Sequence, residues 1–195
     1  MKKILLTLSF LCAIAGQSQS VVIDRLESDG SRQIMTSTKC INLGDFSFYI
    51  GLKMYEMENG RDWLLLLSSY NCIPEDNIIL LKLNNDQIIT LPVTNINSGP
   101  VDSYTPVYHI GNTSFVMTEN SRTYYSSVYV ISPAELDDIE TYGIKKIRTG
   151  NNVMCYEKQY THNALGKFIT KSKKTILDRA KNSMVTKKTS IYDGF

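Results

Sequence analysis

Hydrophobic and polar residues alternate along most of the chain between residues 32 and 160, and short turns rich in Asn, Gly and Asp interrupt the alternation. Successive side chains of a β-strand point to opposite faces, so a period of two indicates strands with one buried face. Short turns between such strands join neighbours in antiparallel order. This part of the chain is therefore predicted to form an antiparallel β meander.

The clearest hairpin is predicted to turn at Asn59-Gly60, because this dipeptide accepts the positive φ angles of a type I′ turn. Counting outward from that turn pairs Glu58 with Arg61, Leu52 with Leu67, and Met54 with Leu65. One face of the hairpin is then apolar: Phe46, Phe48, Ile50, Leu52, Met54, Leu65 and Leu67. The other face is half polar: Tyr49, Lys53, Tyr55, Leu64, Leu66 and Tyr70.

Two further hairpins and three strands follow from the same alternation. Residues 78–83 are expected to pair with residues 87–91, and a hairpin turning at Gly111-Asn112 places Tyr108 opposite Phe115. Further strands are expected over residues 123–131, 144–149 and 153–158.

Two segments have helical rather than strand periodicity. Ser132-Pro133-Ala134-Glu135 is a capping box with proline at the first helical position, and Gly143 is a stop signal, which predicts a short helix over 133–142. Apolar residues of the segment 163–183 fall on one helical face, which predicts an amphipathic C-terminal helix. We expect this helix to cover the half-polar face of the hairpin.

The predicted fold class is α+β, mainly antiparallel β, and a sandwich, a partial barrel and an open sheet under a helix all fit the pattern. Of the 195 residues, 43% are hydrophobic, which is enough to build a core and excludes a disordered chain. We expect one domain over residues 21–183 and a polar tail over 184–195. The predicted core includes Phe48, Ile50, Leu52, Leu65, Leu67, Phe115, Phe168 and Ile169.

The first sixteen residues have the pattern of a secretory signal peptide. A basic start, Met1-Lys2-Lys3, precedes an apolar run over residues 4–14 and small residues near Ala15. The pattern disfavours a lipid anchor at Cys12, because Ser9 and Leu11 stand where a lipoprotein site has leucine and a small residue. An exported protein, periplasmic or extracellular, is predicted.

Charge is unevenly distributed along the chain. Residues 17–157 contain 10 Lys and Arg against 17 Asp and Glu, whereas residues 158–195 contain 9 against 2. On the predicted C-terminal helix, Lys167, Lys171, Lys174 and Lys181 fall together on the outer face. Such a stripe suits an acidic partner or a weak contact with an anionic membrane surface, or it is simply a solvated helix face. Nucleic acid is not expected as a partner of an exported protein.

Few residues suggest catalysis. The chain has two histidines, His109 and His162, without the spacing of a zinc site, and it contains no G-x-S-x-G elbow, G-x-G-x-x-G loop or P-loop. No metal or cofactor is predicted. After signal-peptide removal Cys40, Cys72 and Cys155 remain, and we expect them to be small buried hydrophobic residues. The alternatives are one disulfide between two of them, whose connectivity the sequence does not give, or a Cys155–His162 pair in an unrecognised hydrolase.

Tyrosine is abundant, with twelve in the chain against six phenylalanines. Tyr124, Tyr125 and Tyr129 share one predicted strand, and amphipathic rings of this kind suit recognition of a protein or a glycan. Tyrosine also has high strand propensity, which accounts for the rings without any partner.

Two segments follow the predicted meander: Ile131-Ser132-Pro133-Ala134-Glu135-Leu136 and Tyr142-Gly143-Ile144-Lys145-Lys146-Ile147-Arg148. With them the layout resembles that of secreted β-rich proteins of Gram-negative gut bacteria for which no activity is established. The resemblance is specific only over residues 129–148. It implies an exported β-rich module and no functional residue. Together these patterns predict a non-catalytic exported binding or interaction module.

Overall fold

The computed structural model describes residues 19–44, 46–70, 73–100, 107–110, 113–116 and 123–186; side chains of 97–100, 107–110, 113–116, 123–124 and 183–186 are not described. Several residues of the sequence predictions lie outside the described part: the signal peptide, Cys12, Cys72, residues 187–195 and the side chain of Phe115. The strands are β1 Val21–Leu26, β2 Arg32–Thr36, β3 Lys39–Leu43, β4 Phe46–Met57, β5 Gly60–Ser69, β6 Ile78–Leu83, β7 Ile88–Pro100, β8 Val107–Ile110, β9 Thr113–Val116, β10 Thr123–Ile131, β11 Ile144–Gly150 and β12 Cys155–Gln159. The helices are α2 Pro133–Tyr142 and α3 Ala164–Thr186.

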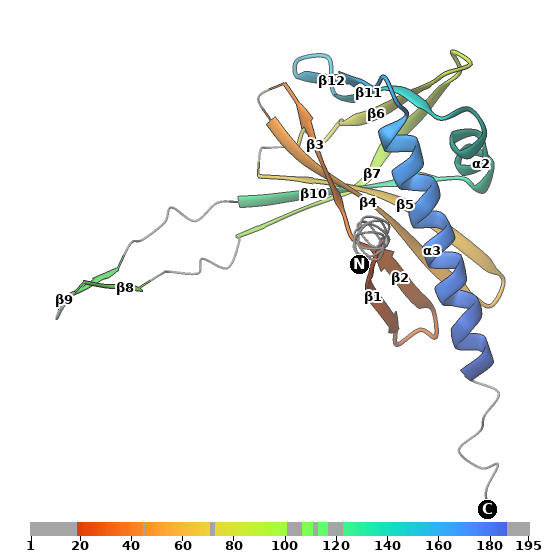
Figure 1. The fold of residues 1–195 in the computed structure, drawn as a ribbon, viewed down its shortest axis with the longest axis horizontal. Coiled ribbons are helices and arrows are strands. Elements are labelled where there is room, and N and C mark those ends of the chain that lie inside the picture. The colour runs from red at the N-terminus through yellow and green to blue at the C-terminus, as the bar shows by residue number, and fades with distance from the viewer. Residues whose placement is uncertain are drawn as a thin grey trace, which may run out of the picture.

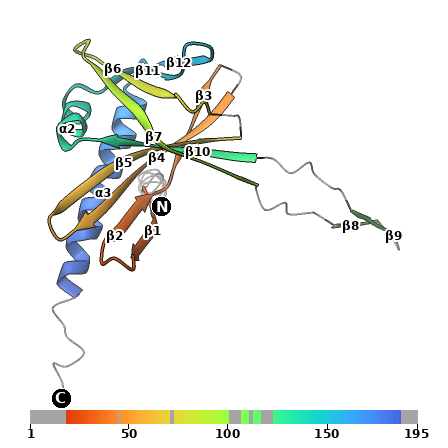
Figure 2. The ribbon, with the colours of Figure 1, turned by 180° about the vertical axis from the view of Figure 1, so that it is seen from behind.

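Ten of the strands form one antiparallel sheet in the order β1-β2-β4-β5-β10-β7-β6-β11-β12, with β3 also paired to β4. The sheet does not close, and the long helix α3 runs across one of its faces (Figure 1). Figure 2 shows the same sheet from behind, with α3 on the far side. The predicted α+β class is confirmed, and of the architectures that the sequence left open the structure has the open sheet under a helix.

The hairpin of β4 and β5 has the predicted faces but a register shifted by two residues. Met57 pairs with Gly60 and Leu52 pairs with Leu65, so Glu58 and Asn59 form the turn. Neither Asn59 nor Gly60 has a positive φ, so the predicted type I′ turn is wrong. A type I turn favours glycine at its fourth position, where Gly60 lies here. Because a shift of two keeps every side chain on its face, the predicted apolar face survives the error.

The other local predictions agree with the structure. Residue 78 pairs with residue 92 and residue 82 with residue 88, and Tyr108 lies opposite Phe115. Helix α2 begins after the capping box of Ser132 and Glu135 and ends at Gly143, whose φ is 71°. Helix α3 extends three residues beyond its predicted end, and β12 begins two residues later than expected.

One hydrophobic core lies between α3 and the apolar face of the sheet. Helix α3 contributes four fully buried residues, Leu165, Ile169, Ile176 and Ala180. They belong to the same cluster as the apolar residues of β4 and β5: Ile50, Leu52, Met54, Leu65 and Leu67. Phe48 is also buried and Phe168 is partly buried. The prediction that α3 covers the half-polar face is wrong, because removing the apolar face from water is the more favourable arrangement. Lys53, Tyr55, Leu64 and Leu66 on the opposite face stay half-buried.

Asn163 joins the start of α3 to the beginning of β11. Its side-chain Oδ1 accepts a hydrogen bond from the backbone N–H of Ile144 at 2.7 Å. The side chain occupies space beside two glycines: a Cβ atom at Gly143 would lie 2.2 Å from Asn163 Nδ2, and one at Gly166 would lie 2.1 Å from Asn163 Oδ1. Both glycines are therefore required for the close approach of Asn163.

Asp24 connects β1 and β2 to α3. Arg179 Nε donates to Asp24 Oδ2 at 2.6 Å, and Arg32 donates to both carboxylate oxygens at 2.8 Å. Burial raises the pKa of the Asp24 carboxyl, but the hydrogen bonds and charges of Arg179 and Arg32 outweigh it and hold the pKa below its ordinary value. Folding therefore favours the ionised carboxylate.

We expect Asp24→Asn to lower the free energy of unfolding at pH 7 by about 0.5–1 kcal/mol, because Arg179 is largely exposed and water screens the ion pair. The stabilisation is present above the pKa of the unfolded chain, about 3.9, and is lost as pH falls through the lower pKa of the folded state. Urea unfolding of both proteins between pH 7 and pH 2.5 measures the difference, which should disappear in the acidic range. A difference independent of pH would contradict the role of the carboxylate charge.

Candidate functional site

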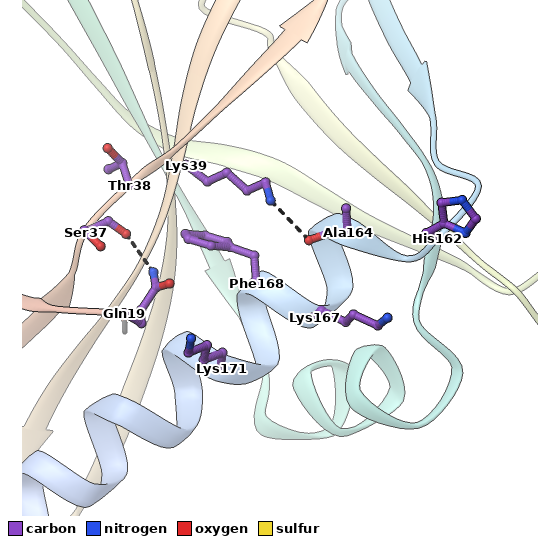
Figure 3. A pocket seen from close by; sticks show the side chains of 9 residues that line it. All are labelled: Gln19, Ser37, Thr38, Lys39, His162, Ala164, Lys167, Phe168 and Lys171. Carbon is purple, nitrogen blue, oxygen red and sulfur yellow. Dashed lines mark hydrogen bonds between the residues drawn. The ribbon is translucent and has the colours of Figure 1, made fainter. Parts of the chain in front are cut away.

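A cavity of about 600 Å³ opens between the loop joining β2 to β3 and the first turns of α3. We call it the basic pocket, and Figure 3 shows the residues that line it: Gln19, Ser37, Thr38, Lys39, His162, Ala164, Lys167, Phe168 and Lys171. The residues come from three distant parts of the chain. No lining residue carries a carboxylate, and the three lysines make the pocket cationic.

A bulge in the edge of the sheet forms one wall of the basic pocket. Strands β2 and β3 both pair with β4, and between their pairings residues 36–38 oppose residues 51–52. The extra residue bends the strand and interrupts the ladder of hydrogen bonds. A Cβ atom at Gly51 would lie 3.0 Å from Thr38 Cγ2, so glycine permits the close approach at this bulge.

Hydrogen bonds to the bulge fix the rim of the basic pocket. Gln19 Nε2 donates to the carbonyl oxygen of Ser37 at 2.9 Å, and the N–H of Ser37 donates to the carbonyl oxygen of Ser20 at 2.8 Å. The chain just before β1 is thereby held against the β2–β3 loop, as Figure 3 shows for Gln19 and Ser37.

Lys39, the first residue of β3, spans the pocket toward α3. Its Nζ donates to the carbonyl oxygen of Ala164 at 3.5 Å and lies 5.8 Å from the centre of the Phe168 ring (Figure 3). An ammonium group has three N–H donors, and this long contact satisfies at most one of them among the described residues. Lys39 therefore keeps donors for a ligand in the pocket.

Helix α3 contributes the remaining cations. Lys167 and Lys171 lie one turn apart and are exposed, and His162 is exposed in the segment before the helix. In Figure 3 Lys167 extends toward the side of His162, whereas Lys171 lies on the side of Gln19. Cations on two sides of a cavity, without acidic neighbours in its lining, suit an anionic group such as a carboxylate, sulfate or phosphate.

All four lysines predicted to share the outer face of the C-terminal helix are exposed: Lys167, Lys171, Lys174 and Lys181. Two other cations of α3 form ion pairs with neighbouring elements. Lys173 Nζ lies 2.5 Å from Asp137 Oδ1 and 3.0 Å from Glu140 Oε2 of α2, and Arg179 binds Asp24.

The structure does not bring Cys155 and His162 into a hydrogen bond. Cys155 begins the edge strand β12, whereas His162 lines the basic pocket, which does not include Cys155. Cys40 and Cys155 are free thiols at exposed positions, so the expectation that they are buried is wrong for both. Each occupies an outward-facing position near the edge of the sheet, where burial is not available.

Among the predicted recognition tyrosines, Tyr129 is buried. Its hydroxyl accepts hydrogen bonds from Asn77 Nδ2 and, at 2.9 Å, from Ser127 Oγ, and Thr149 Oγ1 donates to Asn77 Oδ1 at 3.2 Å. Burial raises the pKa of the Tyr129 hydroxyl against the effect of these hydrogen bonds. The ring therefore belongs to the core and is not an exposed recognition surface. Tyr125 is half-buried, and the side chain of Tyr124 is not described.

The acidic residues of α2 have structural contacts. Glu135 closes the capping box, Asp137 and Glu140 bind Lys173, and Asp138 accepts a hydrogen bond from Gln87 at 3.0 Å. Within the described residues no group of three His, Cys, Asp or Glu side chains could hold a metal ion.

Sequence reasoning found the lysines of α3 but not the other walls of the basic pocket. Lys39 is a single lysine in a strand, and Gln19, Ser37 and Phe168 have no distinctive spacing, so no local signal joins them. The bulge at residues 36–38 interrupts the strand alternation, but a bulge alone does not indicate a pocket.

Comparisons with protein-family models, with curated proteins and with solved structures gave no match to this chain. Neither of the helices in the described ranges combines the length and the apolar character needed to cross a bilayer.

Proposed function

We propose that the protein is a non-catalytic, exported binding module and that the basic pocket binds an anionic group of its ligand. The observation that carries the proposal is the lining of the pocket, which includes Lys39, Lys167 and Lys171 and no carboxylate. Export is supported by the signal-peptide pattern of residues 1–16.

The dimensions of the pocket support a small ligand or one end of a larger one. Its volume of about 600 Å³ lies within the range of about 300–1,000 Å³ typical of small-molecule sites. Phe168 adds an apolar ring to the cationic lining, so the pocket suits an organic anion better than a fully hydrated inorganic one. The partner is accordingly a glycan or protein bearing acidic groups.

The arrangement favours binding over catalysis. A hydrolytic site needs a nucleophile and a base within hydrogen-bond reach of each other, and neither Cys155 nor Cys40 lies in the lining of the pocket beside His162. The Cys155–His162 hydrolase stays a prediction of the sequence without a contact that favours it.

The proposal is tested by titrating the purified protein with citrate in an isothermal calorimeter at low salt. We expect Lys39→Gln combined with Lys167→Gln to weaken citrate binding at least about tenfold, because each cation contributes roughly 1 kcal/mol at a partly exposed site. Binding should also weaken as salt is added, because the Debye length falls from about 10 Å at 0.1 M to about 3 Å at 1 M.

Lys53→Gln is the matched control, since Lys53 lies on the opposite face of β4 with its Nζ 4.5 Å from the Tyr55 ring centre. This variant should bind citrate like the unmodified protein. Absence of citrate binding, or equal loss in the pocket variant and the control, would overturn the assignment of the pocket.

A further inference from the structure

The exposed lysines of α3 form a straight line that begins in the basic pocket. We call Lys167, Lys171, Lys174 and Lys181 the basic line. On an α-helix these positions lie within an arc of about 80°, and the distance along the axis from first to last is about 21 Å. Lys167 and Lys171 belong to both features, so pocket and line are continuous.

The cations of the basic line are separate from those that hold the fold together. Lys167, Lys174 and Lys181 form no ion pair with any residue of the described ranges, whereas Lys173 and Arg179 on other faces of α3 bind carboxylates of α2 and β1. Asp178 is exposed within the same arc and reduces the charge of the line without removing its excess of lysines. Lys167, Lys174 and Lys181 are therefore available to an anionic partner.

We infer that the basic pocket and the basic line together bind one linear acidic polysaccharide, with an acidic sugar in the pocket and the following sugars along α3. This inference rests on the proposed function of the pocket and names its ligand class. A row of cations one or two helical turns apart is complementary to a row of carboxylates or sulfates along an extended chain.

Two features favour a polysaccharide over other anions. The Phe168 ring is half-buried beside Lys39, so the apolar face of a sugar can pack on the ring while its acidic group meets the ammonium. A flat bilayer could touch Lys174 and Lys181, but it does not account for Lys39, which lies at the start of β3 on the other side of the pocket from α3. A small anion would occupy the pocket and leave the rest of the line unused.

The test compares galacturonate oligomers of two lengths, a trimer and an octamer, in calorimetric titrations of the purified protein. Replacing Lys181 with glutamine should weaken octamer binding about fivefold and change trimer binding less than about twofold, because Lys181 lies about 21 Å along the axis from Lys167 and only the longer chain reaches it. Lys39→Gln combined with Lys167→Gln should weaken binding of both oligomers. Lys53→Gln is the control on the opposite face and should change neither.

The outcomes distinguish this inference from the proposed function. If the octamer binds like the trimer and the Lys181 replacement changes nothing, the inference fails while the pocket stands. If neither oligomer responds to the Lys39 and Lys167 replacements, both fail. Cosedimentation with vesicles containing phosphatidylserine tests a membrane as the alternative partner. If the vesicles bind the protein through the basic line and the octamer does not bind, the line belongs to a membrane contact and the inference is overturned.

Discussion

Replacing Leu52 with alanine is expected to lower the free energy of unfolding by about 2–5 kcal/mol. Leu52 is completely buried, lies opposite Leu65 on β5 and belongs to the cluster beneath α3. The truncated side chain would leave a cavity that the surrounding helix and strands can fill only in part, so both transfer energy and packing contacts are lost. Equilibrium unfolding in urea measures this loss of stability as a lower urea concentration at the midpoint, with an unchanged dependence of the unfolding free energy on urea.

The neighbouring residue provides the control for this prediction. Lys53 follows Leu52 in β4 but points to the opposite, half-exposed face of the sheet. We expect Lys53→Ala to cost less than about 1 kcal/mol, which is typical of substitutions at positions that remain in contact with water. Equal losses for Leu52→Ala and Lys53→Ala would contradict the assignment of the buried face.

Gly166→Ala should destabilise the protein by about 1–3 kcal/mol, although the same change at an ordinary helix position stabilises by roughly 0.5–1 kcal/mol. The reversed sign follows from Asn163, whose Oδ1 would lie 2.1 Å from the new Cβ atom. To avoid the overlap Asn163 must move, and its hydrogen bond to the N–H of Ile144 is then lost. Thermal and urea unfolding of the variant measure the cost.

A double-mutant cycle identifies the cause. Asn163 has a φ of 50°, so Asn163→Gly removes the side chain without imposing a new backbone strain. In the Asn163→Gly background, Gly166→Ala should lower the free energy of unfolding much less than it does in the native chain. The double variant should therefore be more stable than the sum of the two single effects predicts. Stabilisation by Gly166→Ala alone would show that the side chain of Asn163 does not occupy this space.

Local features of the fold could be predicted because their causes lie within a few residues of one another. The capping box at Ser132 and Glu135 satisfies the first N–H groups of α2 from within one turn, and the alternation in β4 and β5 records which face is buried. The error in the turn at Glu58 and Asn59 was also local, because a type I turn with glycine at its fourth position competes with the type I′ turn that Asn-Gly suggests.

The candidate site could be predicted only on its helical side. The spacing of Lys167, Lys171, Lys174 and Lys181 places them on one helical face in any fold that buries the apolar face of α3. Tyr129 shows the limit of the same reasoning. Strand alternation places it on one face of β10, but its burial depends on packing with residues distant in sequence, such as Asn77.

The sequence by itself determined the strands of the hairpins, the two helices and the faces that each of them buries, since periodicity, capping and turn preferences act over one or two turns of chain. Only the tertiary structure decided that β10 lies between β5 and β7, that α3 covers the apolar face, and that Lys39, Lys167 and Lys171 line one pocket. Backbone hydrogen bonds between strands are the same for every side chain, so the identity of a distant partner strand leaves little trace in the sequence. The basic pocket is assembled by those pairings, and for that reason it appears only when the chain has folded.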